Sequence, residues 1–388
     1  MWGRVSLPLM QIQYVSDVAG LAEVREALDG ASRIALDCEA AGYHRYSDRL
    51  CLIQLTVNGR TFLLDPLRVE PGPTLGEALR SASTEVIMHG ADYDVRLIDR
   101  DLGIRVSGLF DTQIGASLLG AEATGLGALL EARLGVHISK KFQKADWAQR
   151  PLPPAMIEYA ATDTAHLEEL GEQLREELHR TGRLEWATEE FRELEKVRFE
   201  EGREADPVLR VRAARDLVPR EVERLREALA WRDGIAREAD RAPFRVAGDD
   251  VLVEAARTNP SNVSELAAIR GMGRGVARES GGELLRRFAG VDRKADGELR
   301  GYPSRGPGAN GAFGGRPSPE VEDRIARLKA VRNAKAAALG IDRGTLLSNA
   351  VLQAIAEAPP TDTTAVSRVP GMRRWQAELL ARELLAAL

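Results

Sequence analysis

The sequence predicts an α/β domain with a mixed β-sheet, followed by two small domains built only of helices. Its 388 residues imply two or three domains, at roughly 100 to 200 residues per domain. Short apolar segments alternate with helical segments in the first half only, which is the pattern of an α/β fold. The second half repeats itself without a gap at a displacement of 100 residues.

Strands are predicted where short apolar segments meet turn residues. Asn58-Gly59 separates two such segments and is a strong hairpin signal, so we expect a β-meander in this part of the chain. A later apolar segment, 85–89, leads into a helix over 93–101. The predicted meander strands are 33–37, 50–57 and 60–64.

Helix signals flank the remaining α/β segments. Leu109-Phe110 precedes a helix that Asp111 is expected to cap. Pro153 and Pro154 begin a helical pattern that runs to about residue 180. Strands alternating with helices in this way predict a sheet of mixed direction.

The C-terminal half contains an internal repeat. Arg232 recurs as Arg332, Pro260 as Pro360, and Gly271-Met272 as Gly371-Met372. Matching glycine, proline and apolar positions in the same order indicate two copies of one helical domain. The expected boundaries are 11–205 for the α/β domain, 212–290 and 318–388 for the two helical domains, and 291–317 for a flexible Gly/Pro-rich linker.

Charge is distributed unevenly along the chain. The total of 54 Lys+Arg against 59 Asp+Glu gives a net charge of −5, which at face value speaks against a nucleic-acid partner. Residues 1–205 hold 23 basic and 34 acidic residues (−11), whereas residues 206–388 hold 31 and 25 (+6). The acidic half is suited to metal-binding carboxylates and the basic half to phosphate contacts.

Composition excludes several classes of protein. With 44% hydrophobic and 29% charged residues the chain is expected to be globular rather than disordered. Cys38 and Cys51 cannot form a disulfide framework, or a four-ligand zinc site without histidine, which fits a reducing cytoplasm. No apolar run of 18 residues and no signal-peptide pattern is present, so we expect a cytoplasmic protein with no membrane partner.

Three acidic motifs are candidate parts of one site. Asp37 and Glu39 are two residues apart at a strand end and therefore share a face, where a divalent cation would relieve their repulsion. Tyr159 and Asp163 are four apart on one helical face. Asp94 opens a helix that follows a strand, an edge where sites form in α/β sheets; Asp92 is the competing choice there but is more simply a cap. Taken singly, each motif is also compatible with ordinary surface residues.

Together these motifs resemble the tyrosine-bearing subgroup of the DEDD 3′-5′ exonuclease superfamily. The segments 52–55, 110–113, 146–147 and 150–152 resemble ribonuclease D more specifically, and the helical repeats resemble HRDC domains. The resemblance implies a ribonuclease H-like exonuclease domain. It also implies a 3′-5′ exoribonuclease that trims RNA 3′ ends and releases nucleoside 5′-monophosphates, with tRNA precursors and other structured RNAs as the expected substrates. A DNA 3′-5′ exonuclease and an inactive nucleic-acid-binding adaptor are the alternatives.

The resemblance also assigns roles to the site residues. Two divalent ions, Mg²⁺ or Mn²⁺, are expected, with Asp37 bridging both. Glu39 and Asp163 would hold the ion that generates hydroxide, and Asp94 would support the second ion. Tyr159 would aim the attacking water. We expect the chain to act as a monomer.

Contacts to RNA are expected from two loops. Ribonuclease D proteins usually carry a bulky residue after the motif glutamate, whereas this chain has Ala40-Ala41-Gly42. Stacking on a base could instead come from one of three nearby side chains, Tyr43, His44 or Tyr46. Phosphate contacts could come from the basic residues around Trp147, which are Lys140, Lys141, Lys144 and Arg150; a solvated loop is an equally good interpretation.

Overall fold

The computed structural model describes residues 11–200, 206–303 and 318–388. The chain forms two compact units. The first contains the residues before Ala40, Leu50–Phe199 and the C-terminal helices. The second contains Ala40–Arg49 together with the helices that lie between residues 206 and 303.

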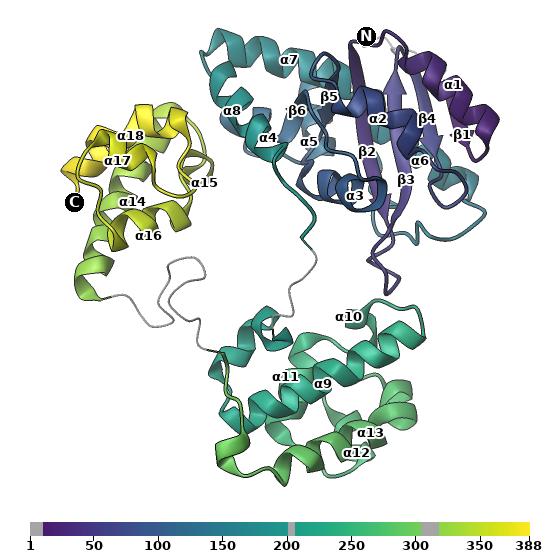
Figure 1. The fold of residues 1–388 in the computed structure, drawn as a ribbon, viewed down its shortest axis with the longest axis vertical. Coiled ribbons are helices and arrows are strands. Elements are labelled where there is room, and N and C mark those ends of the chain that lie inside the picture. The colour runs from purple at the N-terminus through teal and green to yellow at the C-terminus, as the bar shows by residue number, and fades with distance from the viewer. Residues whose placement is uncertain (1–10, 201–205, 304–317) are drawn as a thin grey trace, which may run out of the picture. The chain divides into compact units, whose positions relative to one another are not determined.

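A mixed β-sheet is the centre of the first unit. Among the described residues it has six strands in the order β1-β4-β3-β2-β5-β6 (Figure 1). β3 and β4 are antiparallel, whereas the β1–β4, β2–β5 and β5–β6 pairs are parallel. The turn between β3 and β4 has positive φ at Asn58 (51°) and Gly59 (75°), so the predicted hairpin is confirmed. The strands are β1 (Gln11–Val15), β2 (Arg33–Ala40), β3 (Leu50–Val57), β4 (Arg60–Leu64), β5 (Glu85–Met88) and β6 (Leu109–Asp111).

Helices cover this sheet. β3 is buried along its whole length, and because strand side chains alternate between faces, both faces of β3 must be covered. α3 and α6 both contact it. No described helix of the protein is long and apolar enough to cross a membrane. The helices of this part are α1 (Val18–Leu28), α2 (Gly72–Arg80), α3 (Asp92–Leu102), α4 (Thr112–Leu118), α5 (Leu126–Leu134), α6 (Pro154–Ala165), α7 (Leu167–Arg180) and α8 (Leu184–Leu194).

Three details differ from or confirm the sequence prediction. β1, α1, α2, α5 and α8 were not predicted. The helix predicted from Pro154 to about residue 180 is two helices, because His166 leaves helical geometry with φ −116° and ψ 4°. Asp111 caps α4 as predicted, since its Oδ1 accepts from the backbone N–H groups of Gln113 (2.8 Å) and Ile114 (3.0 Å).

The two helical repeats have the same architecture. Each helix of the first copy starts 100 residues before its counterpart in the second copy. Figure 1 shows each copy as a small group of packed helices. Gly271 (φ 92°) and Gly371 (φ 82°) take the same left-handed conformation before the last helix. The helices are α9 (Pro219–Glu238), α10 (Pro243–Val246), α11 (Asp249–Thr258), α12 (Val263–Ala268) and α13 (Arg274–Asp292), then α14 (Pro319–Leu339), α15 (Arg343–Leu346), α16 (Asn349–Glu357), α17 (Thr363–Ser367) and α18 (Arg374–Ala386).

The second unit extends beyond the predicted bounds of the first helical domain. Two 3₁₀ helices, η1 (Pro207–Arg210) and η2 (Arg212–Asp216), precede α9, and η3 (Asp296–Glu298) follows α13. Glu223 accepts a hydrogen bond from the Arg300 backbone N–H (3.0 Å), and Arg226 donates to the Gly301 carbonyl (2.8 Å). Residues 291–303 are therefore folded against α9 rather than being part of a flexible linker. The rest of the predicted linker, 304–317, lies outside the described residues.

The second helical repeat belongs to the same compact unit as the sheet. Trp186 of α8 stacks on Trp375 of α18 with ring centroids 4.8 Å apart. Glu190 accepts from the Trp375 indole N–H (2.9 Å), and Glu189 accepts from the backbone N–H groups of Arg374 (2.5 Å) and Trp375 (3.0 Å). Glu189 thus satisfies orphan backbone N–H groups at the start of α18 and complements its dipole, while Glu190 fixes the Trp375 ring.

Candidate active site

Three carboxylates from two elements converge on one point. Asp37 and Glu39 lie two residues apart on β2, so the strand presents both on one face. Asp163 comes from α6 and is only 9% exposed. Each of the three offers an oxygen, and these oxygens all lie within 4.8 Å of one another. The predicted pairing of the strand motif with the helix motif is thus present in the fold.

The pKa values of these three carboxyl groups show that ionising all of them together is unfavourable. Burial raises the pKa of Asp37 from 3.8 to about 7. Burial, then Asp37, raises the pKa of Asp163 from 3.8 to about 8. Burial, then the charges of its carboxylate neighbours, raises the pKa of Glu39 from 4.5 to about 10. A hard divalent cation with oxygen ligands would remove this repulsion, so the donor set fits Mg²⁺ or Mn²⁺.

Asp94 is the fourth carboxylate of the site. It lies in the first turn of α3 and is 7% exposed. Burial raises its pKa well above 3.8, and the charges of Asp37 and Asp111 raise it further. Asp92, the competing residue, instead has a 62% exposed side chain that pairs with Arg96 at 3.0 Å. The structure therefore favours Asp94 over Asp92 as the residue that faces the cluster.

Asp111 is a supporting residue that the sequence did not assign to the site. It is fully buried, and its Oδ2 accepts from the Ala91 backbone N–H at 2.8 Å. This bond ties the end of β6 to the residue before α3, and so fixes the start of the helix that carries Asp94. The sequence shows Asp111 only as a helix cap, because its second partner lies 20 residues earlier in the chain.

Tyr159 lies one helical turn before Asp163. Its half-buried ring meets Phe142 edge-on (centroids 5.7 Å apart) and Trp147 at a tilt (6.1 Å). Burial, then the nearby carboxylates led by Asp163, raises its pKa above 10. The phenol is therefore protonated at neutral pH, which suits it to donate a hydrogen bond rather than to act as a base.

Two of the predicted RNA-contact residues point into the protein. Trp147 is 2% exposed and packs beside Tyr159. The Arg150 guanidinium makes two bonds of 2.7 Å to Asp65, and further bonds of 2.7 Å to the carbonyls of Trp147 and Cys51. The predicted RNA contacts are therefore not supported for Trp147 and Arg150. Both hold the loop that packs on Tyr159, and Arg150 has a partner, Asp65, that is distant in sequence.

The three predicted lysines lie at the surface. Lys140, Lys141 and Lys144 are exposed. The Lys141 ammonium lies 5.2 Å from the Phe142 ring centroid, and that ring contacts Tyr159. The loop that carries these lysines therefore leads into the aromatic wall beside the carboxylates, which is formed by Phe142, Trp147 and Tyr159.

The loop after Glu39 belongs to the second unit. The Tyr46 hydroxyl donates to Asp233 of α9 (2.9 Å), so this side chain anchors the loop. Tyr43 is 40% exposed and its ring contacts His44 (5.3 Å) and Phe244 (5.5 Å). Of the three predicted stacking residues, Tyr43 presents the most exposed ring.

Within the segment Ala40-Ala41-Gly42, the glycine has a local structural reason, whereas nothing in the structure explains the small residue directly after Glu39. The Gly42 backbone N–H donates to Asp48 Oδ1 at 2.8 Å, which closes the loop. A Cβ at this position would lie 2.4 Å from the same oxygen. The closure therefore requires a glycine where a side chain would displace Asp48.

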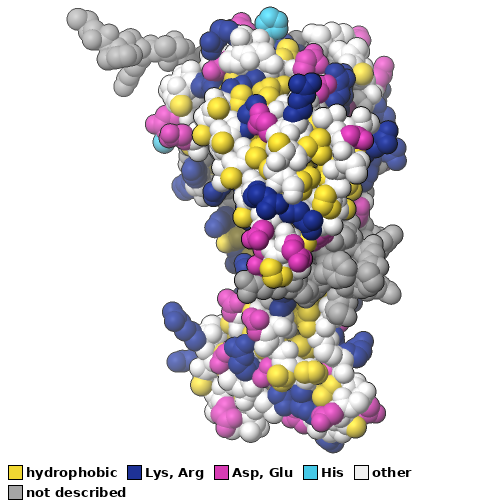
Figure 2. All heavy atoms as spheres, turned by 90° about the vertical axis from the view of Figure 1, so that its left-hand side faces the viewer, with side chains coloured by type: hydrophobic (Ala, Val, Ile, Leu, Met, Phe, Trp, Pro, Cys, Tyr) yellow, Lys and Arg dark blue, Asp and Glu magenta, His cyan; other side chains and the backbone are white. Residues whose placement is uncertain are grey.

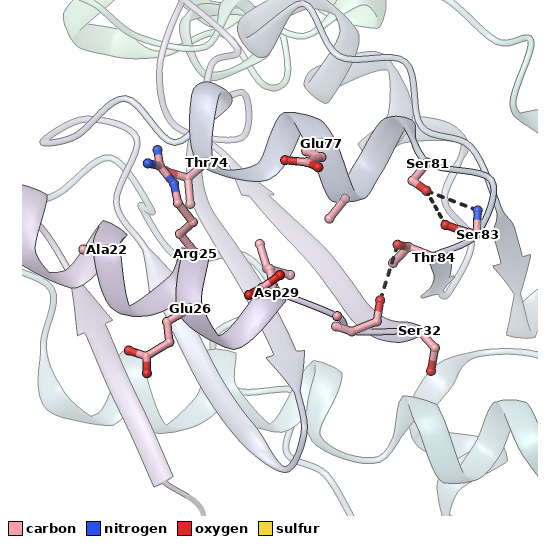
Figure 3. Close-up of a pocket in the computed structure, with 14 residues that line it drawn as sticks. Ala22, Arg25, Glu26, Asp29, Ser32, Thr74, Glu77, Ser81, Ser83 and Thr84 are labelled. Atoms are coloured by element: carbon pink, nitrogen blue, oxygen red, sulfur yellow. Dashed lines mark hydrogen bonds between the residues drawn. The ribbon is translucent and has the colours of Figure 1, made fainter.

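A separate hollow of about 740 Å³ lies between α1 and α2 (Figure 3). Its charged lining residues are three acidic side chains and one arginine, which disfavours a phosphate. None of the predicted site residues lines it. The charged residues are Arg25, Glu26, Asp29 and Glu77.

Comparisons with known proteins agree with this arrangement. Residues 12–179 match the 3′-5′ exonuclease family, and residues 221–287 and 321–388 each match the HRDC domain. A ribonuclease D from Granulibacter bethesdensis is 31% identical over 362 residues, which cover 91% of this chain and 86% of that protein. The chain belongs to the ribonuclease D family. It is accordingly a hydrolase of the 3′-5′ exoribonuclease class, with a ribonuclease H-like exonuclease domain and two HRDC domains.

Solved structures of related proteins support the same assignment. The Escherichia coli RNase D structure, described as an exoribonuclease involved in structured RNA processing, has a TM-score of 0.71 and 25% identity, and the match covers 98% of this chain and 99% of that chain. The catalytic core of RRP6 from Trypanosoma brucei has a TM-score of 0.65 and 26% identity, over 74% of this chain and 81% of that one. The family predicted from the acidic motifs is therefore confirmed.

Proposed function

We propose that this ribonuclease D-type chain trims the 3′ ends of structured RNAs, tRNA precursors among them, by metal-dependent hydrolysis at Asp37, Glu39, Asp94 and Asp163. The observation that carries the proposal is the convergence of buried carboxylates beside a protonated Tyr159. A site this acidic repels a phosphodiester unless cations occupy it. Substrate binding therefore depends on the same ions that the carboxylates hold.

The four carboxylates would hold two Mg²⁺ or Mn²⁺ ions. When bound, such ions supply an activated water and stabilise charge on the attacking and leaving oxygens. Asp111 ties the residue before α3 to the end of β6 and so fixes the start of the helix that carries Asp94. Tyr159 would donate a hydrogen bond from its hydroxyl to the attacking oxygen, keep its proton, and so orient that oxygen toward phosphorus. The leaving 3′ oxygen then departs with the upstream RNA, and the product is a nucleoside 5′-monophosphate.

Several features support RNA as the substrate. Lys140, Lys141 and Lys144 offer exposed cations beside the aromatic wall. Tyr43 offers a partly exposed ring, four residues after Glu39, for a base to stack on. The structural resemblance to Escherichia coli RNase D, whose description names structured RNA processing, supports structured RNAs as the substrate class, within which we propose tRNA precursors.

The chain is proposed to act as a monomer in the cytoplasm. All four carboxylates and Tyr159 come from one chain, so a single copy has a complete site. Cys38 and Cys51 are buried free thiols, which suits a reducing compartment.

The test uses a tRNA with a short 3′ extension, 5′-labelled and incubated with Mg²⁺ or with a chelator. The proposal expects stepwise shortening from the 3′ end in Mg²⁺ only, and nucleoside 5′-monophosphates as products. A DNA strand of the same sequence, run in parallel, should be degraded more slowly. Equal or faster loss of the DNA, or shortening in the presence of chelator, would contradict the proposal.

A further inference from the structure

The two HRDC domains differ at one buried arginine. In the first, the Arg232 guanidinium donates to Asp249 Oδ1 at 2.6 Å and to the Ala247 carbonyl at 3.0 Å. In the second, the equivalent Arg332 donates to Asn349 Oδ1 at 2.8 Å and to the Leu347 carbonyl at 3.1 Å. The geometry is the same, but the carboxylate has become a neutral amide. The second domain therefore holds a guanidinium whose counter-ion is missing.

Arg332 is only 4% exposed, so this difference matters energetically. A buried cation is costly unless an anion compensates it. Its remaining partner, Asn333 Oδ1 (3.1 and 3.2 Å), is also neutral. Burial lowers the pKa of Arg332, and the positive charge of Arg343 lowers it further, with a smaller opposing effect from Asp342. Asp342 thus offsets only part of this positive field, and no carboxylate among the described residues pairs with the Arg332 guanidinium.

Arg332 opens onto a hollow of about 480 Å³, here called the Arg332 pocket. Lys329 lies on the same face of α14, three residues before Arg332. Lys329 and Arg343 are exposed at the mouth, and neither forms an ion pair with any residue that the structure describes. The lining has three cationic side chains against one carboxylate. It consists of Lys329, Arg332, Asn333, Asp342, Arg343, Gly344 and Asn349.

A helix start adds to this positive field. α16 begins at Asn349 with no acidic residue in its first turn, whereas the equivalent α11 begins with Asp249 and Asp250. The start of α16 is therefore capped only by the neutral Ser348 hydroxyl, and no acidic side chain in its first turn balances the positive end of its dipole. Asp342, the single carboxylate of the lining, is occupied in capping α15, where its Oδ1 accepts from the Gly344 N–H at 2.6 Å.

The first HRDC domain serves as an internal control. The seven positions that correspond to the Arg332 pocket carry a formal charge of −1 in the first domain (Arg232 against Asp233 and Asp249). In the second they carry +2 (Lys329, Arg332 and Arg343 against Asp342). The hollow at the start of α11 is lined by three arginines and three aspartates, and so is balanced.

The matching surface of the first domain also has another occupant. Asp233 accepts from the Tyr46 hydroxyl at 2.9 Å, and the Ala242 N–H donates to the His44 carbonyl at 3.0 Å. There the surface holds the loop that follows Glu39. In the second domain the equivalent residues, Asn333 and Asp342, line the open Arg332 pocket. The two copies therefore differ at this surface: in the first domain it binds the loop that follows Glu39, and in the second it forms a cationic pocket.

We infer that the second HRDC domain binds a backbone phosphate of RNA in the Arg332 pocket. The inference rests on RNA being the substrate, as proposed above. A phosphate oxygen would supply the anion that Arg332 lacks, while Lys329 and Arg343 contact the same or the next phosphate. On the face drawn in Figure 2, Lys and Arg side chains are interspersed with Asp and Glu rather than merged into one basic surface. Binding through a local pocket suits such a mixed surface.

The decisive variant is Asn349→Asp, which restores the counter-ion of the first domain with almost no change in shape. RNA affinity is measured by fluorescence anisotropy with a chelator present, so that no hydrolysis occurs, at several salt concentrations. We expect affinity to fall about tenfold and the slope of log K against log salt to shrink by about 0.7 for each phosphate that the variant no longer neutralises. The melting temperature should be unchanged or higher, because Arg332 gains an ion pair. Hydrolysis of a dinucleotide in Mg²⁺ should be unchanged.

Asp249→Asn in the first domain is the matched control, and it should leave RNA affinity unchanged. Lys329→Ser and Arg343→Ser, both at exposed positions, should weaken RNA binding as Asn349→Asp does. If all three pocket variants bind RNA with unchanged affinity, the proposed phosphate site is refuted, whatever their hydrolytic activity. Conversely, a wild-type protein that binds RNA in chelator but does not hydrolyse it in Mg²⁺ would count against the proposed function, and the pocket variants would still report on binding.

Discussion

Replacing Arg150 by methionine should destabilise the protein and misplace Tyr159 at the same time. Arg150 holds the fully buried Asp65 through two bonds of 2.7 Å, and its own side chain is only 13% exposed. Although burial by itself would raise the pKa of Asp65, the hydrogen bonds from Arg150 and Tyr14 outweigh it and hold that pKa below 3.8. The ion pair thus contributes stability above the unfolded pKa of Asp65, and the contribution is lost as pH falls through the lower folded value.

The magnitude follows from what Arg150→Met leaves behind. Asp65 becomes a buried charge without its cation, which costs about 3 to 5 kcal/mol. The carbonyls of Cys51 and Trp147 also lose a donor at 2.7 Å. Because the Trp147 backbone is one of these anchors and its ring packs beside Tyr159, we expect kcat to fall with little change in KM.

Urea unfolding at neutral pH measures the first effect, and the double variant Arg150→Met/Asp65→Asn is its control. Removing both charges leaves no unpaired buried ion, so the double variant should be more stable than Arg150→Met by about 2 kcal/mol or more. For the second effect, Tyr159→Phe should reduce kcat far less in the Arg150→Met background than in the wild type. Two results would refute this reasoning. One is an Arg150→Met/Asp65→Asn variant that is no more stable than Arg150→Met. The other is a Tyr159→Phe substitution that lowers kcat by the same factor in the wild type and in the Arg150→Met background.

Three further outcomes are expected. Tyr159→Phe should lower kcat by about 10² to 10⁴ without changing the melting temperature, as measured by single-turnover hydrolysis and thermal melts. Burial raises the pKa of Asp37 to about 7 and that of Asp163 to about 8, so the metal-free protein should lose stability as pH rises through these values. Melting temperatures measured across this pH range should show the loss in chelator, and they should show that Mg²⁺ removes it. Trp375→Ala should lower the free energy of unfolding by about 3 to 5 kcal/mol and make the second HRDC domain more accessible to protease. Trp231→Ala, at the core tryptophan of the first HRDC domain, is the comparison variant.

The grouping of the proposed site residues could be predicted from the sequence, because local periodicity places them in pairs. A spacing of two on a strand places Asp37 and Glu39 on one face, and a spacing of four on a helix does the same for Tyr159 and Asp163. The supporting residues could not be predicted in this way. Asp111 bonds to a backbone group 20 residues earlier, and Arg150 binds a carboxylate 85 residues earlier. Only the folded sheet brings those partners together.

The fold shows the same division between local and tertiary information. The β3–β4 hairpin follows from Asn58-Gly59, and the helical repeat follows from an exact offset in the sequence. β1 escaped prediction because it is short and largely exposed at the sheet edge, where alternation is weak. The break at His166 was missed because the helical pattern continues across it. The cationic pocket needed both kinds of information: the sequence supplies Asn349 in place of aspartate, and the structure shows that Arg332 is buried beside it.

The most direct test of the catalytic site is the Mg²⁺-dependent digestion of a 5′-labelled RNA by the wild type and by Asp37→Asn. We expect a ladder of products shortened one nucleotide at a time from the 3′ end by the wild type, and a rate at least about 10³-fold lower for the variant. Digestion by Asp37→Asn at the wild-type rate would contradict the assignment of these carboxylates as the active site.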